Sequence, residues 1–351
     1  MPHVHKRDQE LHGLLIVDKP GQQTTIAQAE VDALSLAPSP AMSQPLTATS
    51  ARKPTNRDFT SHDVVQVVRR WSGQRQIGHT GTLDPMASGV LVLCLGAATR
   101  LVEYYQGHAK QYYAEIVLGS ATDTYDATGV TCATATIPPL TLSQIEAALQ
   151  QFRGDILQLP PIYSALKQGG ETLYQKARRG EVVSVTPRPV SFYQIDLLEY
   201  RAPDRICLRI HCSAGTYIRS LAYDLGLALQ TVAHLAVLRR EAAGQFTLAD
   251  AHTLTEIEQM AQQGRLTELL RPLGAGLDMP SIHLDQESVR RFGHGQKVVL
   301  ASPAVANEEI GLLAAGYDIQ NHSVGILRCI ATATPPNIGF VWKAEKWFIQ
   351  S

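Results

Sequence analysis

A short loop at residues 78–85, with the sequence GHTGTLDP, gathers residue types that can do chemistry. Its two glycines permit a tight backbone path close to a ligand, and it carries Asp84 and His79 as candidate functional side chains. A structural interpretation competes, because Asp before Pro is a common helix start with Asp as the N-cap. A lone histidine is also more often a turn or buried hydrogen-bonding residue than an acid-base catalyst. Local chemistry alone therefore favours a structural role for both.

A second candidate region lies at residues 167–188, which contain five basic and two acidic side chains. Tyr163 and Tyr174 lie beside and within it, offering planes on which bases or ribose can stack, while the basic groups can contact phosphate. The basic residues are Lys167, Lys176, Arg178, Arg179 and Arg188. A helix face exposed to solvent would carry the same charges. RNA binding by this region therefore needs independent support.

The motifs of several other enzyme classes are absent from the sequence. It has no G-x-x-x-x-G-K-[ST] phosphate loop, no G-x-G-x-x-G after a strand, no H-E-x-x-H and no G-x-S-x-G elbow. Its twelve histidines are not grouped at metal-ligand spacing. An enzyme with this sequence is expected to work with side chains alone, without a metal or cofactor.

Strands and helices must together position these side chains. Short apolar runs predict strands at residues 12–18, 112–118, 191–198 and 205–212, and a buried segment at 89–95. Helices are predicted from Ser61 as N-cap to Trp71, at 98–105, from the Ser143-x-x-Glu146 capping box to Phe152, and at 216–229. Because these elements do not alternate regularly, the predicted fold class is α+β rather than a doubly wound sheet.

Length and composition limit the possible classes of protein. The chain has 351 residues, 44% of them hydrophobic, and a formal net charge of −1. Its length predicts two domains, or one large domain with an appendage. Its net charge near zero argues against a protein that coats nucleic acid through overall positive charge, but it permits a local basic groove. Five scattered cysteines, no signal-like segment and no run of ~20 apolar residues predict a cytoplasmic protein outside the membrane.

Two segments differ in composition from the rest of the chain. Residues 21–58 contain four prolines and no aromatic residue, which predicts a loop insertion or a disordered linker. Short alternating runs at 297–300, 310–313, 323–330 and 340–342 predict a small β domain after about residue 280. Basic and acidic residues balance in this last region, so its charge does not indicate strong phosphate binding.

Several blocks, in family order, resemble the TruB family of tRNA pseudouridine synthases. Residues 78–101, GHTGTLDPMASGVLVLCLGAATRL, resemble the catalytic motif of that family. The other blocks are GLLIVDKP at 13–20, KQYY at 110–113, PIYSALK at 161–167, GTYIR at 215–219 and LRR at 238–240. Apart from the insertion, the resemblance extends to about residue 300.

This resemblance implies that uridine 55 in the tRNA T loop is extruded and isomerised to pseudouridine, without metal or cofactor. It implies a pseudouridine synthase fold, with a mixed central sheet flanked by helices and a small C-terminal PUA-like β domain. The implied division is a catalytic domain at 1–280, with a polar insertion at 21–58 and an RNA-clamping insertion at 160–190, then a C-terminal domain at 281–351. The implied partner is the tRNA T stem-loop, bound by a monomer without an obligatory protein partner.

The resemblance also implies roles for three reactive-centre residues. Asp84 matches the essential aspartate, a nucleophile or general base at the sugar–base junction. Tyr112 resembles the tyrosine that stacks on the flipped uracil and helps to remove its C5 proton. Arg219 resembles the arginine that pairs with the aspartate, and such a pair is expected to keep Asp84 ionised by lowering its pKa.

Four further residues are implied to bind substrate. His79 resembles a residue that stacks within the displaced RNA, and Tyr217 and Leu238 resemble walls of the uridine pocket. Lys19 is chosen for the family's Lys-Pro element because it follows the first strand, although a second Lys-Pro pair stands at residues 53–54. In this chain 39 residues separate Lys19-Pro20 from Thr60, whereas family members run almost directly from one element into the other.

Two other functions share these features. One is an RNA-binding helper that opens and re-forms the tRNA elbow, with catalysis incidental. The other is the guide-RNA-dependent branch of the same superfamily, which relies on partner proteins; the clamp-like stretch at 160–190 argues against it.

Overall fold

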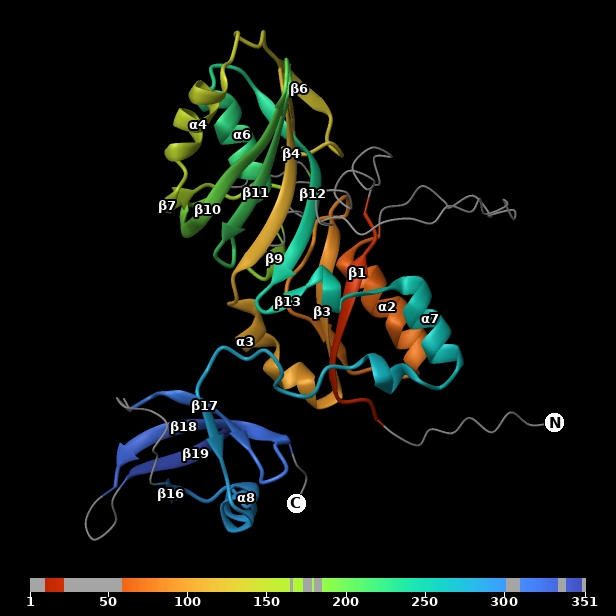
Figure 1. Cartoon of the computed structure of the whole chain (residues 1–351), viewed down its shortest axis with the longest axis vertical. Coiled ribbons are helices and arrows are strands. Elements are labelled where there is room, and N and C mark those ends of the chain that lie inside the picture. Colours follow the sequence, from red (N-terminus) through yellow and green to blue (C-terminus); the bar gives the residue numbers. More distant parts are fainter. Residues whose placement is uncertain are drawn as a thin grey trace, which may run out of the picture.

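The computed structural model describes residues 10–21, 59–164, 167–172, 179, 185–300, 310–333 and 339–348. Within these residues, a ten-stranded mixed sheet forms the larger part and a five-stranded sheet the C-terminal part (Figure 1). Except for Gly21, the predicted polar insertion lies outside the described residues, as do the Lys-Pro pair at 53–54 and much of the predicted clamp, including residues 173–178 and 180–184.

The large sheet is mostly antiparallel. Its strands are β1 (Gly13–Lys19), β2 (Ile77–His79), β3 (Ser88–Leu95), β4 (Lys110–Leu118), β7 (Gly154–Gln158), β10 (Arg188–Arg201), β11 (Arg205–Cys212), β12 (Ala233–Ala243), β13 (Phe246–Thr247) and β14 (His252–Thr253). The order is β14-β1-β3-β12-β4-β11-β10-β7, with β2 on β3 and β13 on β12. The β1–β14 and β3–β12 pairs are parallel, so the sheet is mixed, which confirms the predicted α+β class with a mixed central sheet.

The remaining elements before the C-terminal sheet are helices and two small hairpins. The helices are α2 (Ser61–Ser72), α3 (Val102–Gln106), α4 (Leu142–Gln150), α6 (Ile218–Ala228) and α7 (Leu254–Gln262), with 3₁₀ turns η1 (Gly96–Leu101), η2 (Leu248–Asp250) and η3 (Leu266–Leu269). The hairpins pair β5 (Ser120–Thr122) with β6 (Thr131–Thr134), and β8 (Lys167–Gln168) with β9 (Glu171–Thr172).

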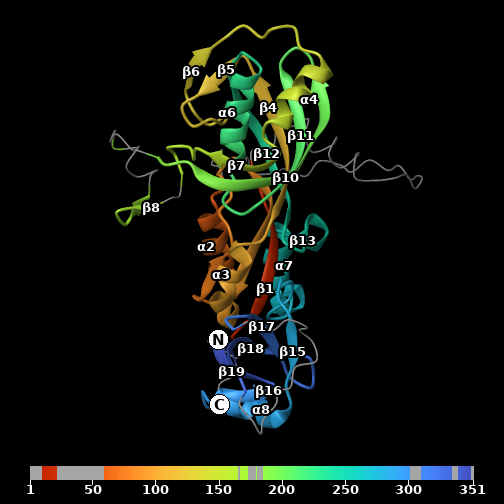
Figure 2. The ribbon, with the colours of Figure 1, turned by 90° about the vertical axis from the view of Figure 1, so that its left-hand side faces the viewer.

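One buried apolar cluster joins these helices to the large sheet. Val64 of α2, Ile145 of α4, Leu221 of α6 and Ile257 of α7 all belong to it. Alternate residues of β4, from Tyr112 through Ala114 and Ile116 to Leu118, face the same cluster, as the two-residue period of a strand requires. Helices α2, α4, α6 and α7 therefore cover one face of the sheet (Figures 1 and 2), whereas α3 packs in a second cluster. Tyr112 lies in the first cluster, near the beginning of β4.

Two predicted N-caps are wrong by one or two residues. Helix α2 is capped by Thr60, whose side chain accepts from the N–H of Asp63 and whose own N–H donates to the Asp63 carboxylate. Helix α4 is capped by Thr141 in the same way, with Gln144 in place of the predicted Ser143 and Glu146 box. In each case a threonine upstream of the predicted serine forms the reciprocal pair of hydrogen bonds of a capping box.

The C-terminal sheet forms a separate β domain below the large sheet (Figure 1). Its order is β15 (Ser281–His283), β17 (Leu313–Tyr317), β18 (Ser323–Thr332), β19 (Phe340–Trp347) and β16 (Val298–Leu300). The strand predicted at 310–313 begins only at Leu313, and helix α8 (Gln286–Gly293), capped by Asp285, was not predicted. Among the described residues, no helix is both long and apolar enough to cross a membrane.

The two sheets share an apolar contact. Leu14 and Ile16 of β1 belong to a second cluster, apart from α2, α4, α6 and α7, which also contains Ala315 of β17 and Ile326 of β18. Because each of these four side chains is fully buried, the C-terminal domain is packed against the large sheet rather than tethered by a linker alone.

Candidate active site

Asp84 lies in the loop at residues 80–87 that connects β2 to β3. The interpretation of Asp84 as a helix N-cap is wrong. The N–H of Ala87 donates to the Asp84 carbonyl at 3.0 Å, which closes a tight turn, and the chain then enters β3 at Ser88. The Asp84 carboxylate is therefore not used by a helix terminus and is available for other contacts.

Two side chains from other elements hold the first half of this loop. Ser61, at the start of α2, accepts a hydrogen bond from the N–H of Leu83 at 2.8 Å and donates to its carbonyl at 3.2 Å. Arg240 of β12 donates to the carbonyls of Gly81 at 3.1 Å and Val90 at 2.7 Å. Since the Ser61 and Arg240 side chains are buried, their hydrogen bonds fix the backbone on the N-terminal side of Asp84.

Lys19 holds the second half of the loop from below. Its ammonium donates to the carbonyls of Pro20, Pro85 and Ala87 at 2.9, 3.1 and 2.6 Å, and its side chain is 0% exposed. Two of these acceptors, Pro85 and Ala87, lie within three residues after Asp84 in the chain. This geometry gives Lys19 a positioning role beneath the loop, and contact with substrate by Lys19 stays a prediction.

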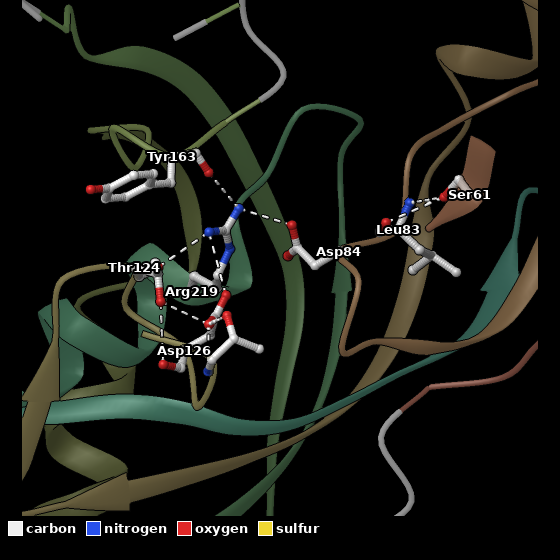
Figure 3. A network of polar contacts seen from close by, with 8 residues as sticks. Ser61, Leu83, Asp84, Thr124, Asp126, Tyr163 and Arg219 are labelled. Atoms are coloured by element: carbon white, nitrogen blue, oxygen red, sulfur yellow. Dashed lines mark hydrogen bonds and ion pairs between the residues drawn. The ribbon is translucent and has the colours of Figure 1, made fainter. Parts of the chain in front are cut away.

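The Asp84 carboxylate pairs with Arg219 from the first turn of α6 (Figure 3). Nη2 of Arg219 donates to Oδ1 of Asp84 at 2.9 Å and to the carbonyl of Tyr163 at 3.1 Å. Nη1 donates to the carbonyl of Thr124 at 3.2 Å and lies 3.5 Å from Oδ2 of Asp126. One guanidinium therefore connects the β2–β3 loop to the turn between β5 and β6, and its planar fork of donors fits these several acceptors.

Burial has the larger effect on the charge of Asp84. It raises the pKa of the Asp84 carboxyl, the neighbouring Arg219 guanidinium lowers it, and the Asp126 carboxylate raises it again. The arginine lowers the pKa as expected, but the net direction is upward, so the pair does not hold the pKa of Asp84 below its ordinary value. Desolvation penalises the charged form, and a second buried carboxylate shares the same arginine.

A cavity of about 1050 Å³ opens beside Asp84. The described residues that line it include Asp84, Tyr112, Tyr217, Arg219 and Leu238, five residues from four separate segments that the family resemblance predicted for the site. The volume is at the upper end of the roughly 300–1000 Å³ usual for small-molecule pockets, so it has room for one extruded nucleotide together with flanking groups. His79 and Lys19, the other two residues predicted for the site, are not among the described residues that line the cavity.

Tyr112 and His79, two aromatic side chains predicted for the site, both have pKa values that favour the neutral form. Tyr112 is 9% exposed, and burial raises the pKa of its phenol, with Arg240 opposing the shift. His79 ends β2, and burial together with the charge of Arg240 lowers the pKa of its imidazole. Both rings are therefore held in their neutral forms near pH 7, which suits stacking on bases.

Three residues of the site were not predicted to belong to it: Ser61, which was predicted only as an N-cap, Arg240, which was noted only as part of the LRR block, and Asp126. Asp126 is 3% exposed and lines the cavity, and a buried carboxylate requires a partner, which Arg219 supplies. Its only sequence signal was the acidic, threonine-rich composition of residues 119–129. Among the described residues, no three His, Cys, Asp or Glu side chains are grouped so that they could hold a metal ion.

Comparison with known proteins identifies the family. The sequence profile of the TruB family pseudouridylate synthase (N terminal domain) matches residues 69–218, and that of the tRNA pseudouridylate synthase B C-terminal domain matches residues 219–278. The chain is therefore a pseudouridine synthase, an isomerase. More narrowly, the chain belongs to the TruB family.

Curated relatives agree with this assignment. Proteins named tRNA pseudouridine synthase B are 45% identical in Xanthomonas campestris (72% of this chain, 82% of the relative) and 38% identical in Haemophilus influenzae (80% and 90%). Among solved structures, a chain of a Cbf5-Nop10-Gar1 complex superposes with a TM-score of 0.67 at 24% identity, covering 97% of this chain and 86% of that one. This likeness confirms the pseudouridine synthase fold.

Proposed function

We propose that this chain converts uridine 55 in the T loop of tRNA to pseudouridine, and that Asp84 acts at the sugar–base junction. The observation that carries the proposal is the Asp84–Arg219 pair at the wall of a cavity also lined by Tyr112 and Leu238. The tRNA substrate is supported by the names of relatives 38–45% identical to this chain. As in the sequence-based prediction, the enzyme works in the cytoplasm as a monomer.

The reaction is an isomerisation and needs no external oxidant or reductant. The bond between N1 of uracil and C1′ of ribose breaks, and a bond from C5 to the same C1′ forms. C5 loses its proton and N1 gains one, so atoms and electrons balance. Because neither C1′ nor C5 is accessible while the base is stacked in RNA, the nucleotide must first be extruded into the cavity.

The residues around the cavity have different roles in this reaction. Asp84 in its ionised form is the nucleophile or general base, and Arg219 orients the carboxylate through the 2.9 Å hydrogen bond. Tyr112 and Leu238 form walls against which the flat uracil ring packs. Burial raises the pKa of the Tyr112 phenol, so the phenol is neutral near pH 7 and its first role is to stack on uracil. The C5 proton must pass to a group that can accept it.

The test is the variant Asp84→Asn with a T-stem-loop RNA. We expect no measurable pseudouridine under single-turnover conditions, with the Kd for RNA close to that of the wild type, because the amide keeps the shape but cannot act as nucleophile or base. Wild-type activity in the variant would overturn the role of Asp84. Mapping pseudouridine in total tRNA with and without the protein tests the position; loss elsewhere than at 55 would overturn that assignment.

The two other functions are outcomes of related experiments. Full rescue of a deletion strain by Asp84→Asn would favour the RNA-folding helper. Activity of the purified chain alone on a tRNA transcript would exclude dependence on a guide RNA or partner proteins, whereas inactivity without them would favour the guide-dependent branch.

A further inference from the structure

Tyr125 lies between the two residues that contact Nη1 of Arg219. Thr124 supplies a carbonyl at 3.2 Å and Asp126 a carboxylate oxygen at 3.5 Å. Tyr125 itself has a φ of 63°, in the left-handed region that large side chains rarely adopt. A strained residue persists only where its surroundings hold it, and such residues cluster at functional sites.

The Tyr125 side chain is held by a ring from helix α6. Tyr125 and Tyr223 stack with ring centroids 4.3 Å apart and an interplanar angle of 19°. Figure 2 shows the β5–β6 hairpin lying beside α6. The stack is thus a contact between the loop at residues 123–130 and the helix that carries Arg219.

Arg219 and Tyr223 are four residues apart, so they lie on one face of α6, a single turn from each other. The helix therefore contacts the β5–β6 loop at two adjacent points: Arg219 contacts the backbone of Thr124 and the carboxylate of Asp126, and Tyr223 contacts the ring between them. The position of Asp126 relative to Arg219 depends on both contacts.

The other hydrogen bonds of the loop run within it or to strand β12, where the N–H of Ala127 donates to the carbonyl of Leu235 at 2.9 Å. Oδ1 of Asp126 accepts from Thr124 and Thr128 within the loop itself. The carbonyl of Tyr125 accepts from Leu235 of β12 at 3.0 Å, which attaches the loop to the sheet. The Tyr125–Tyr223 stack connects this loop to α6 through side chains, in addition to the contacts of Arg219.

We infer that Tyr125 and Tyr223 are positioning residues for the catalytic centre, acting through Asp126 and Arg219 on Asp84. The stack compensates the strained backbone at Tyr125 and fixes the distance from Asp126 to the guanidinium. Without the stack, Arg219 has alternative hydrogen-bonding arrangements, and the Asp84 carboxylate loses its fixed orientation. The inference rests on the proposed function, because it assigns these tyrosines to the same reaction.

The first test compares three substitutions of Tyr125 in the full chain. Tyr125→Phe keeps the ring and should retain wild-type kcat. Tyr125→Ala loses the ring and keeps the strain, so kcat should fall about tenfold to hundredfold, as expected for a misplaced catalytic group. Tyr125→Gly loses the ring but adopts positive φ freely, so its kcat should lie between the other two. Equal kcat in all three, or Ala above Gly, would overturn the inference.

The second test separates positioning from general weakening of the fold. Tyr223→Ala should lower kcat with the Kd for a T-stem-loop RNA within about threefold of wild type. In an Asp126→Asn background, Tyr223→Ala should lower kcat little further, because the stack acts through Asp126. Fully additive losses, or a loss in Kd alone, would contradict the inference. All assays are run well below each variant's unfolding midpoint, and Tyr223→Phe serves as the matched control.

Different results would overturn the proposed function and the positioning role of the two tyrosines. If the wild type makes no pseudouridine in the T-stem-loop, the proposed function fails. If the wild type is active and Asp84→Asn is inactive, but Tyr125→Ala and Tyr223→Ala match the wild type, only the positioning role is overturned.

Discussion

Asp84 is subject to opposing influences on its charge. Burial in the cavity wall and the nearby Asp126 carboxylate favour the protonated form, whereas Arg219 favours the carboxylate. The net result is a pKa above the ordinary value near 3.9 for aspartate. Because the ionised form is the reactive one, activity should fall with decreasing pH as the medium passes through this raised pKa.

The substitution Arg219→Gln tests this balance. Removal of the guanidinium leaves Asp84 and Asp126 without their shared cation, which raises the pKa of Asp84 further. We therefore expect the acidic limb of kcat/KM to move to higher pH, together with a loss of kcat of at least about 10²-fold from the lost orientation. The measurement is pseudouridine formation on a T-stem-loop RNA between mildly acidic and neutral pH.

Arg205→Gln is the control, since Arg205 pairs with Glu115 and is not among the described lining residues of the cavity. Its pH profile should match that of the wild type. An acidic limb that moves to lower pH in Arg219→Gln would contradict the proposed charge balance.

The buried ammonium of Lys19 holds the loop by donating hydrogen bonds to backbone carbonyls. Lys19→Met leaves carbonyls on both sides of the turn without a donor, at roughly 1–3 kcal/mol for each buried acceptor. We expect a lower free energy of unfolding in urea and a lower kcat, with KM for RNA little changed. Unchanged stability with a raised KM would instead mean that Lys19 contacts the substrate, as the sequence-based prediction holds.

At the scale of elements, the β2–β3 loop is rigid because helix α2 and strand β12 both hold it. Ser61 begins α2 and also carries the two hydrogen bonds to Leu83, one residue before Asp84. The capping function that serine often performs belongs here to Thr60. A helix N-terminus therefore serves as an anchor for the catalytic loop, and its own cap is supplied by a different side chain.

The variant Ser61→Ala should separate this anchoring from helix stability. We expect kcat to fall about tenfold, because the Leu83 N–H loses its partner and the loop shifts. Thr141→Ala in α4 is the matched comparison: it removes an N-cap worth about 1 kcal/mol and should leave kcat unchanged. Thermal unfolding and single-turnover assays of both variants provide the check. Equal effects on kcat would refute the anchoring role.

At the scale of the whole molecule, the C-terminal domain is held by apolar burial more than by charge. Ile326 is fully buried in the cluster that joins the two sheets. Lys346 forms an ion pair with Glu103 at 2.9 Å across the same junction, but the Glu103 side chain is 61% exposed. Exposed pairs contribute little because water screens them.

These magnitudes predict very different effects for two substitutions. Ile326→Ala should lower the free energy of unfolding by about 2–5 kcal/mol, through lost burial and the cavity left behind. Lys346→Ala should change it by less than about 1 kcal/mol. Denaturant titration followed by circular dichroism measures both. A larger effect for Lys346→Ala would mean that charge holds the junction.

The sequence predicted the α+β class and most strands and helices, and its resemblance to the TruB family indicated five of the residues that meet at the cavity. These features follow from short-range properties: strand alternation, apolar runs, and motifs a few residues long. The errors at Thr60 and Thr141 are of the same local kind, because an upstream threonine competes with a serine one or two residues later. They displace helix starts without changing the fold.

The presence of Asp126 as a second carboxylate at the Arg219 guanidinium is visible only in the folded structure. Asp84 and Arg219 are 135 residues apart, and Thr124 and Arg219 are 95 apart, so no local pattern places Asp126 beside them. The burial of Lys19 under a loop 66 residues away was hidden for the same reason. The direction of the Asp84 pKa shift depends on desolvation, a property of everything packed around the carboxyl, and that environment exists only when the distant segments have come together.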